Sequence, residues 1–204
     1  MTRSLDLDAA DSVAVTLDIP AGELQVGGGA AKLLDASFTF NVPGWEPTVD
    51  YHRDGSAAML SISQPSRTTG FSNVTNRWNL KFNDAVPIAM TAHIGAGESH
   101  LALGSLTLRS LDVSVGAGET TVDLSGTPKR SYDAKINASV GEARIKVPRT
   151  AGVVVTASNS IGGVSVSGLV KQGNTWVNAG HEQDAVVIHL DVKGGVGEIH
   201  VDAE

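Results

Sequence analysis

The five residues Ile94-Gly95-Ala96-Gly97-Glu98 return as Val115-Gly116-Ala117-Gly118-Glu119 further along the chain. Shorter versions of the motif are Val140-Gly141-Glu142, Ile161-Gly162-Gly163 and Val196-Gly197-Glu198, and an earlier one is Ala21-Gly22-Glu23. The motif glycines at 97, 118, 141, 162 and 197 are spaced by 21, 23, 21 and 35 residues. Self-similarity at a period of ~20–50 residues is the signature of a repeat architecture.

Residues on both sides of each motif glycine alternate between apolar and polar, as in half-buried β-strands. The apolar column that follows the glycine contains Leu101, Val122, Ile145, Val166 and Val201. The column that precedes it contains Met90, Leu111, Ala134, Val155 and Leu190. Each unit is therefore predicted to be a strand, a glycine turn and a second strand.

A unit this short cannot bury its own apolar face, so neighbouring units must stack. Equivalent residues then lie one strand spacing, ~4.8 Å, apart. Stacking in chain order places Asp112 beside Lys135 and Asp123 beside Lys146, which pairs opposite charges. The sequence therefore predicts an all-β, β-solenoid-like stack of two-strand coils.

The first 86 residues are less regular than the rest. Strand-like alternation is present at 13–19, 23–26, 32–42, 48–52, 57–63 and 78–82, with Pro or Gly turns between these segments. Gln64–Asn73 is polar and long enough to be a mobile loop. We predict one domain over residues 1–204, in which 1–86 form irregular coils and 87–204 form the regular repeats.

The long step between the last two motif glycines indicates an insertion between residues 167 and 187. Within it, Gly173-Asn174 separates two short strand-like segments and is typical of a two-residue hairpin turn. The open end of a stack must be covered, because an exposed sheet edge invites pairing with other chains. We therefore expect a hairpin over 168–184, on which Trp176 covers the C-terminal end.

Composition excludes several classes of function. The net charge is −7 and the 15 Lys and Arg residues are scattered singly, so nucleic acid is not an expected partner. The absence of cysteine excludes disulfides, thiolate metal sites and cysteine nucleophiles. No apolar run is long enough to cross a membrane, and residues 1–11 do not have the pattern of a signal peptide.

Three features together resemble the bacterial toast-rack domains: the stretch Ile19–Ala30 with Leu33-Leu34, the run Asn76–Pro87, and the Gly-Ala-Gly-Glu motifs. These domains are related to the C-terminal domain of LiaF-like cell-wall-active antibiotic response proteins and to putative-adhesin solenoids. The resemblance covers nearly the whole chain. It implies a cell-envelope protein without a known catalytic residue set, whose export or anchor segment is absent from this chain.

Two groups of residues could bind a metal ion. Glu98, Glu119 and Glu142 follow equivalent glycines, so stacking would bring their carboxylates together as oxygen ligands for a divalent cation. Solvated turn residues are the favoured interpretation, because stacked rows usually mix charges and because Gly163 interrupts this row. The second group is the four outward histidines, His93, His100, His189 and His200. None of them belongs to a His-Glu-x-x-His motif or to a close pair of histidines. We expect no metal and no cofactor.

No catalytic motif is present in the sequence. Gly95-Ala96-Gly97 and Gly27-Gly28-Gly29 are each followed by strand-like sequence, whereas a phosphate-binding glycine loop needs a helix there. The alternative to a non-catalytic protein is a β-helix that binds or cleaves polysaccharide, with acidic and basic groups on one outer sheet. The residues available for that role are Asp112, Asp123, Lys135, Arg144 and Lys146.

Trp45, Tyr51 and Trp176 are the candidate partner-binding residues, because aromatic side chains on a β-surface can stack on sugars or form protein contacts. They could instead fill the core or cover the ends of the stack. We predict a non-catalytic, extracytoplasmic binding or scaffold module of a bacterial envelope protein. Its expected partner is a protein or an envelope polymer, and its oligomeric state is left open.

Overall fold

The computed structural model describes residues 1–8, 10–65, 74–181 and 184–204. In these residues there are fourteen strands and no helix, and all the strands join one sheet. The described residues accordingly contain no helix able to cross a membrane. The predicted all-β class is confirmed.

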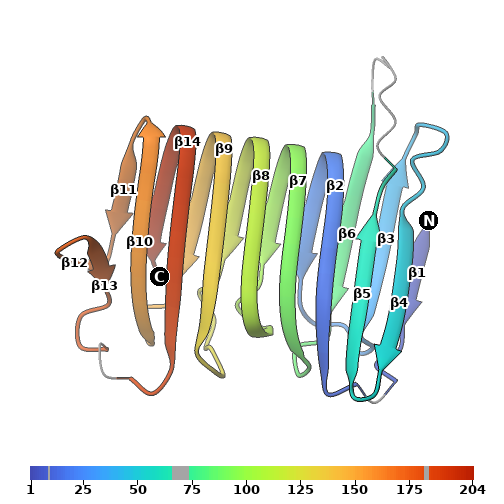
Figure 1. The fold of residues 1–204 in the computed structure, drawn as a ribbon, viewed down its shortest axis with the longest axis horizontal. Helices are drawn as coiled ribbons and strands as arrows, with labels where there is room; N and C mark the ends of the chain where they lie inside the picture. The colour runs from blue at the N-terminus through green and yellow to red at the C-terminus, as the bar shows by residue number, and fades with distance from the viewer. Residues whose placement is uncertain (9, 66–73, 182–183) are drawn as a thin grey trace.

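Five long strands give the sheet its shape: β2 (Ser12–Gly27), β7 (Pro87–Ala102), β8 (Thr107–Asp123), β9 (Tyr132–Val147) and β14 (Val187–Ala203). Each strand rises along one face, bends over a corner and descends along the other face (Figure 1). A sixth coil follows the same path in two strands, β10 (Gly152–Ile161) and β11 (Val164–Ser167). The motif glycine is therefore a corner within a continuous strand in the five long coils, rather than the predicted turn between two strands.

The corners require glycine for two reasons. Gly97, Gly118 and Gly141 have φ of +133°, +130° and +126°, which L side chains rarely adopt. In addition, a Cβ on Gly118 would lie 1.9 Å from the carbonyl oxygen of Gly97, and a Cβ on Gly141 would lie 1.9 Å from that of Gly118. Adjacent coils can stack at the corner only because no side chain stands between them.

The coils are parallel and stack in the order β2-β7-β8-β9-β14-β10. Asp112 faces Lys135 and Asp123 faces Lys146, as predicted. The prediction of stacking in chain order is wrong at one place, because β14 lies between β9 and β10. The last strand thereby pairs along both of its edges, and the outer edge of β10 is left for the inserted hairpin.

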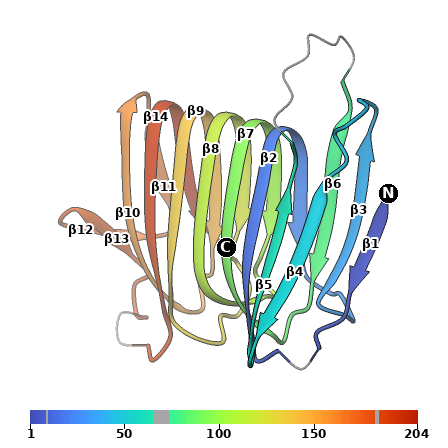
Figure 2. The ribbon, with the colours of Figure 1, turned by 45° about the vertical axis from the view of Figure 1, so that its right-hand side comes forward.

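Beyond β2 the stack continues as two separate branches (Figure 2). On one face β5 (Ala57–Ser63) is parallel to the first half of β2, and β4 (Thr48–Asp54) is antiparallel to β5. On the other face β6 (Asn76–Phe82) is parallel to the second half of β2. Antiparallel β3 (Leu34–Phe40) and β1 (Thr2–Leu5) follow. β5 and β6 are thus the two halves of one coil, and the described residues of this coil contain no corner glycine.

Buried amides join the halves of this interrupted coil. Asn76 Nδ2 donates hydrogen bonds to Gln64 Oε1 at 2.6 Å and to the Ala21 carbonyl oxygen at 2.5 Å. Trp78 Nε1 in turn donates to Asn76 Oδ1 at 3.2 Å. The segment predicted to be a mobile loop, Gln64–Asn73, therefore begins at a buried and hydrogen-bonded residue, and its residues 66–73 lie outside the described part of the chain.

One apolar core fills the space between the two faces of the stack. The predicted inward column is buried at Leu101, Val122, Ile145 and Val201. The largest buried side chains lie in the N-terminal part, where Phe38 and Trp78 meet edge to face with ring centroids 5.4 Å apart. The irregular coils therefore contain the bulkiest part of the core.

The inserted hairpin consists of β12 (Val170–Gln172) and β13 (Thr175–Val177). Gln172 faces Thr175, which confirms the predicted two-residue turn. β13 pairs antiparallel with β10, and Trp176 lies opposite Val155 and packs against the core. The hairpin covers part of the last coil's edge, as expected for the end of a stack.

Substitution of Gly118 by Ala should lower the free energy of unfolding by more than ~2 kcal/mol, because it forces a side chain onto a positive φ and against the Gly97 carbonyl. Chemical denaturation measures the change. The matched control is Ala117→Ser at the neighbouring exposed corner position, which should change stability by less than ~0.5 kcal/mol. Equal stability of the two variants would show that the corner tolerates a side chain.

Substitution of Asn76 by Ala should cost ~2–4 kcal/mol, because it leaves buried groups on Gln64, Ala21 and Trp78 without their partner. Asn79→Ala on the same strand is the control, because that side chain is exposed and bonds only another exposed amide, Gln25. Thermal and chemical unfolding of the two variants compare them. A smaller loss for Asn76→Ala than for Asn79→Ala would contradict the proposed role of the buried amides.

Candidate binding surface

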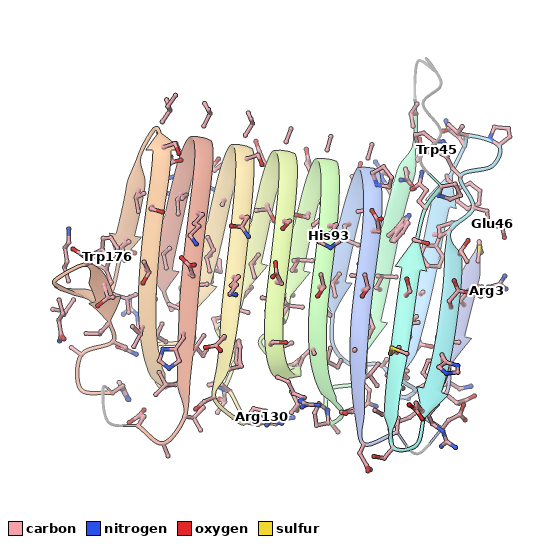
Figure 3. The ribbon with its side chains drawn as sticks, viewed as in Figure 1. Arg3, Trp45, Glu46, His93, Arg130 and Trp176 are labelled. Atoms are coloured by element: carbon pink, nitrogen blue, oxygen red, sulfur yellow. The ribbon has the colours of Figure 1, made fainter. Side chains whose placement is uncertain are left out.

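The corners of six coils line up along one edge of the stack, and side chains stand along this edge (Figure 3). The residue before each corner glycine is apolar in every coil. We call this row the corner crest: Ala21, Ala96, Ala117, Val140, Val196 and Ile161, in stacking order. Its three largest members lie on adjacent strands and are 51%, 47% and 65% exposed at Val140, Val196 and Ile161. The crest is thus an exposed apolar stripe.

The residue after the corner glycine is a glutamate in five consecutive coils. These residues form the glutamate row: Glu23, Glu98, Glu119, Glu142 and Glu198. The expectation that Gly163 interrupts the row is wrong, because β14 inserts before β10 and Glu198 follows Glu142 directly. Gly163 lies beyond Glu198, at the end of the row. The crest is therefore flanked by an acidic stripe along most of its length.

Two members of the glutamate row are in ion pairs. At one end, Glu23 accepts from Arg77 Nε at 2.7 Å. In the middle, Glu142 lies 2.5 Å from Arg144 Nη2 and 3.2 Å from His200 Nε2. Both glutamates are half-buried. The charge of the row is therefore partly neutralised at these two positions.

The other three members, Glu98, Glu119 and Glu198, are exposed. In the described part of the chain, no cationic side chain lies within ion-pair distance of any of them. Equally, no group of three or more His, Asp or Glu among the described residues is arranged to hold a metal ion. The free carboxylates are consequently available to a cation carried by another molecule.

Two shallow hollows lie beside the crest. On one face, small residues such as Gly95, Gly116 and Ser139 leave an open hollow of about 410 Å³, with His93 on its rim (Figure 3). On the other face, an open hollow of about 150 Å³ lies beside Glu98 and Glu119. Both cross several coils. Their shape suits contact with a long ligand more than enclosure of a small substrate.

The outer faces also contain two rows in which charges alternate. Their members are Asp112, Lys135 and Asp191 in one row and Asp123, Lys146 and Asp202 in the other. The pKa of Lys146 is raised, first by its 2.9 Å hydrogen bond to Glu204 and then by the nearby carboxylates of Asp123 and Asp202. The first row precedes the corner glycines and the second follows them, so the two rows lie on opposite faces of the stack. The groups that a polysaccharide-cleaving site would use are therefore not gathered on one outer sheet.

The three aromatic candidates lie at opposite ends of the stack (Figure 3). Trp45 is buried after β3, and Tyr51 on β4 is half-buried and donates to the Leu7 carbonyl oxygen at 3.4 Å. At the other end Trp176 is half-buried, with Lys171 Nζ 5.1 Å from its ring centroid. The aromatic residues do not form one site, and their role in binding stays a prediction.

The crest itself was not predicted from the sequence, although its residues stand in the quoted motifs. Strict alternation places Ala117 on the same side as Val113 and Val115, which are buried. At the corner the alternation breaks, and residues 116, 117 and 119 all face outward. The available signal was the apolar residue before the glycine in every motif.

Parallel coils folded over a line of corner glycines define a β-solenoid-type protein. The family model described as the N-terminal domain of toast_rack, DUF2154, matches residues 1–146. The chain therefore belongs to this toast-rack family, which confirms the resemblance found in the sequence. No curated protein matches the sequence.

Two solved structures are similar to this chain to very different degrees. A putative cell adhesion protein from Clostridium sporogenes is similar over 100% of this chain and 98% of its own, with a TM-score of 0.96 and 27% sequence identity. A putative adhesin from Bacteroides fragilis aligns over 98% of this chain and 96% of its own, with a TM-score of 0.28 and 12% identity. The first of these shares the complete fold of this chain.

Proposed function

We propose that this chain is a non-catalytic, adhesin-like binding module that presents an extended surface outside the bacterial cytoplasmic membrane. Membership of the toast-rack family and similarity to a putative cell adhesion protein support the adhesin-like class. The observation that carries the proposal is the form of the surface. The hollows beside the crest are shallow and open, and they cross several coils of a continuous sheet.

The stack is suited to hold such a surface in a fixed shape. Adjacent coils pair along nearly their full length, including through the corners, so that each long strand is held on both edges. Stacked repeats of this kind give elongated surfaces that bind polypeptides or polymers. The proposed partner is accordingly a protein or an envelope polymer.

Contacts at the two ends would add to those along the coils. Trp176 is half-buried on the short hairpin, and Tyr51 is half-buried on the edge strand β4. Trp45 lies beneath the surface close to the same end as Tyr51 and would support that contact without forming it. We place the partner-binding role of the aromatic residues at these ends.

The binding function can be tested with purified chain and fractions of the bacterial envelope. Wild type should bind a defined envelope protein or glycan, and Trp176→Leu, which preserves apolar packing against β10, should weaken binding by ~10-fold if the hairpin forms part of the contact. Lys135→Ala on the outer face is the control and should leave affinity within ~2-fold. Surface plasmon resonance gives both values. Loss of binding only in Lys135→Ala would move the site to the outer face.

Catalysis and location need separate measurements. Incubation with envelope polysaccharides should release no new reducing ends, and release that disappears in Asp112→Asn or Asp123→Asn would contradict the non-catalytic assignment.

Protease added to intact cells of the native bacterium should digest this domain if it lies outside the membrane, and protection until lysis would contradict that location.

A further inference from the structure

We propose that the corner crest and the glutamate row together form the docking surface for a basic amphipathic helix of a protein partner. This inference rests on the proposed binding function and specifies the chemistry of its partner. It concerns the edge of the stack where the strands bend, rather than the aromatic ends.

The first observation is the apolar character of the crest. Single exposed hydrophobic residues are common on protein surfaces, whereas contiguous apolar stripes with a polar border mark interaction sites. The crest is apolar in six consecutive coils, and its three largest members, Val140, Val196 and Ile161, are exposed and are immediate neighbours. Ala occupies the same position in three other coils, so the fold does not require a larger side chain there.

The second observation is the charge beside the crest. Exposed Glu98 and Glu119 are paired in register on adjacent strands, whose backbones are ~4.8 Å apart, and like charges directly opposite each other are destabilising. Lys or Arg side chains of a partner would remove this repulsion and form ion pairs. A second copy of this chain, with a net charge of −7, would bring another acidic row to the same place. An anionic membrane surface would be repelled in the same way.

The third observation is the spacing of the coils, which favours a helix over an extended segment. An α-helix lying along the crest repeats its faces every ~5.4 Å, close to the strand spacing of ~4.8 Å. Alternate residues of an extended strand are ~6.7 Å apart and lose register with the row after one or two coils. Six coils span ~24 Å, which is the length of a helix of ~16 residues.

In this arrangement the helix lies on the acidic flank of the crest. Its apolar face contacts Val140, Val196 and Ile161. Its basic residues, three or four positions apart, reach the free carboxylates of the glutamate row. The open hollow beside Glu98 and Glu119 leaves space for their side chains.

The test uses the complete chain and a fluorescently labelled 18-residue peptide of Leu and Lys, patterned as an amphipathic helix. A shuffled peptide of the same composition is the control ligand. Fluorescence anisotropy should show binding of the patterned peptide at least ~10-fold tighter than of the shuffled one, and weaker binding at high salt. Equal affinity for both peptides would reduce the interaction to net charge and overturn the proposal.

Two sets of variants test the two stripes. The triple variant Val140→Thr, Val196→Thr, Ile161→Thr keeps β-branching and should weaken binding at least ~10-fold. The double variant Glu98→Gln, Glu119→Gln should do the same. Matched controls are Val170→Thr on the exposed hairpin and Glu46→Gln at the far end, which should leave affinity unchanged. Undiminished binding in either test variant would overturn the proposal.

The same variants also test whether the crest binds something other than a helix. Sedimentation that shows a wild-type dimer lost in the threonine variant would assign the crest to a second copy. Crest-dependent binding to anionic vesicles would assign it to a membrane. Either result overturns the helix. If an envelope partner binds wild type and the threonine variant equally, the docking surface is wrong while the binding function stands. If no envelope partner binds at all, the proposed function itself fails.

Discussion

The contact between the corner glycines is the constraint on which the stack depends. The carbonyl oxygen of Gly97 occupies the place where a Cβ of Gly118 would be, and Gly118 stands in the same relation to Gly141. This contact fixes adjacent corners at the same height, so it sets the register of the residues on both sides of the corner. Between β7 and β8 that register holds back to Ala89, where it shifts by one residue. Buried columns, charge rows and the crest all follow from that register.

The interrupted coil shows what the chain needs where this contact is missing. β5 and β6 pair with the two halves of β2 as a complete coil would, yet they are separate strands, and Asn76 rather than a corner glycine lies next to Gly22. Asn76 occupies the space next to Gly22 and satisfies the Ala21 carbonyl oxygen, while Gln64 completes the link to the other face. At this coil the buried amides of Asn76 and Gln64 thus connect the two faces. In the other coils a corner glycine makes that connection, because its lack of a side chain lets the backbones approach.

The register between neighbouring repeats could be predicted from the sequence, but the complete order of the repeats in the stack could not. Asp112 opposite Lys135 follows from alignment of the motif glycines Gly118 and Gly141, because each of the two residues lies six positions before its glycine. The position of β14 does not follow, since the repeat at Gly197 fits equally well beside Gly141 or Gly162. The hairpin was predictable from local turn chemistry at Gly173-Asn174. The stacking of Glu98, Glu119 and Glu142 was predicted too and is confirmed, whereas the place of Glu198 beside Glu142 needed the long-range strand order.

At the corner crest, the alternation of apolar and polar residues along the strand no longer predicts which residues are exposed. A corner turns the residues on both sides of the glycine outward. Period-two alternation therefore predicts the wrong side of the sheet for some of these exposed residues. Packing inside the stack places no demand on the residue before the glycine, and Ala96 and Ala117 fold into the same corner as Val140 and Val196. Ala96 and Ala117 show that the corner folds without a larger side chain, so packing of the stack does not account for the exposed valines and isoleucine beside the free carboxylates. We attribute them to the proposed contact with a partner helix.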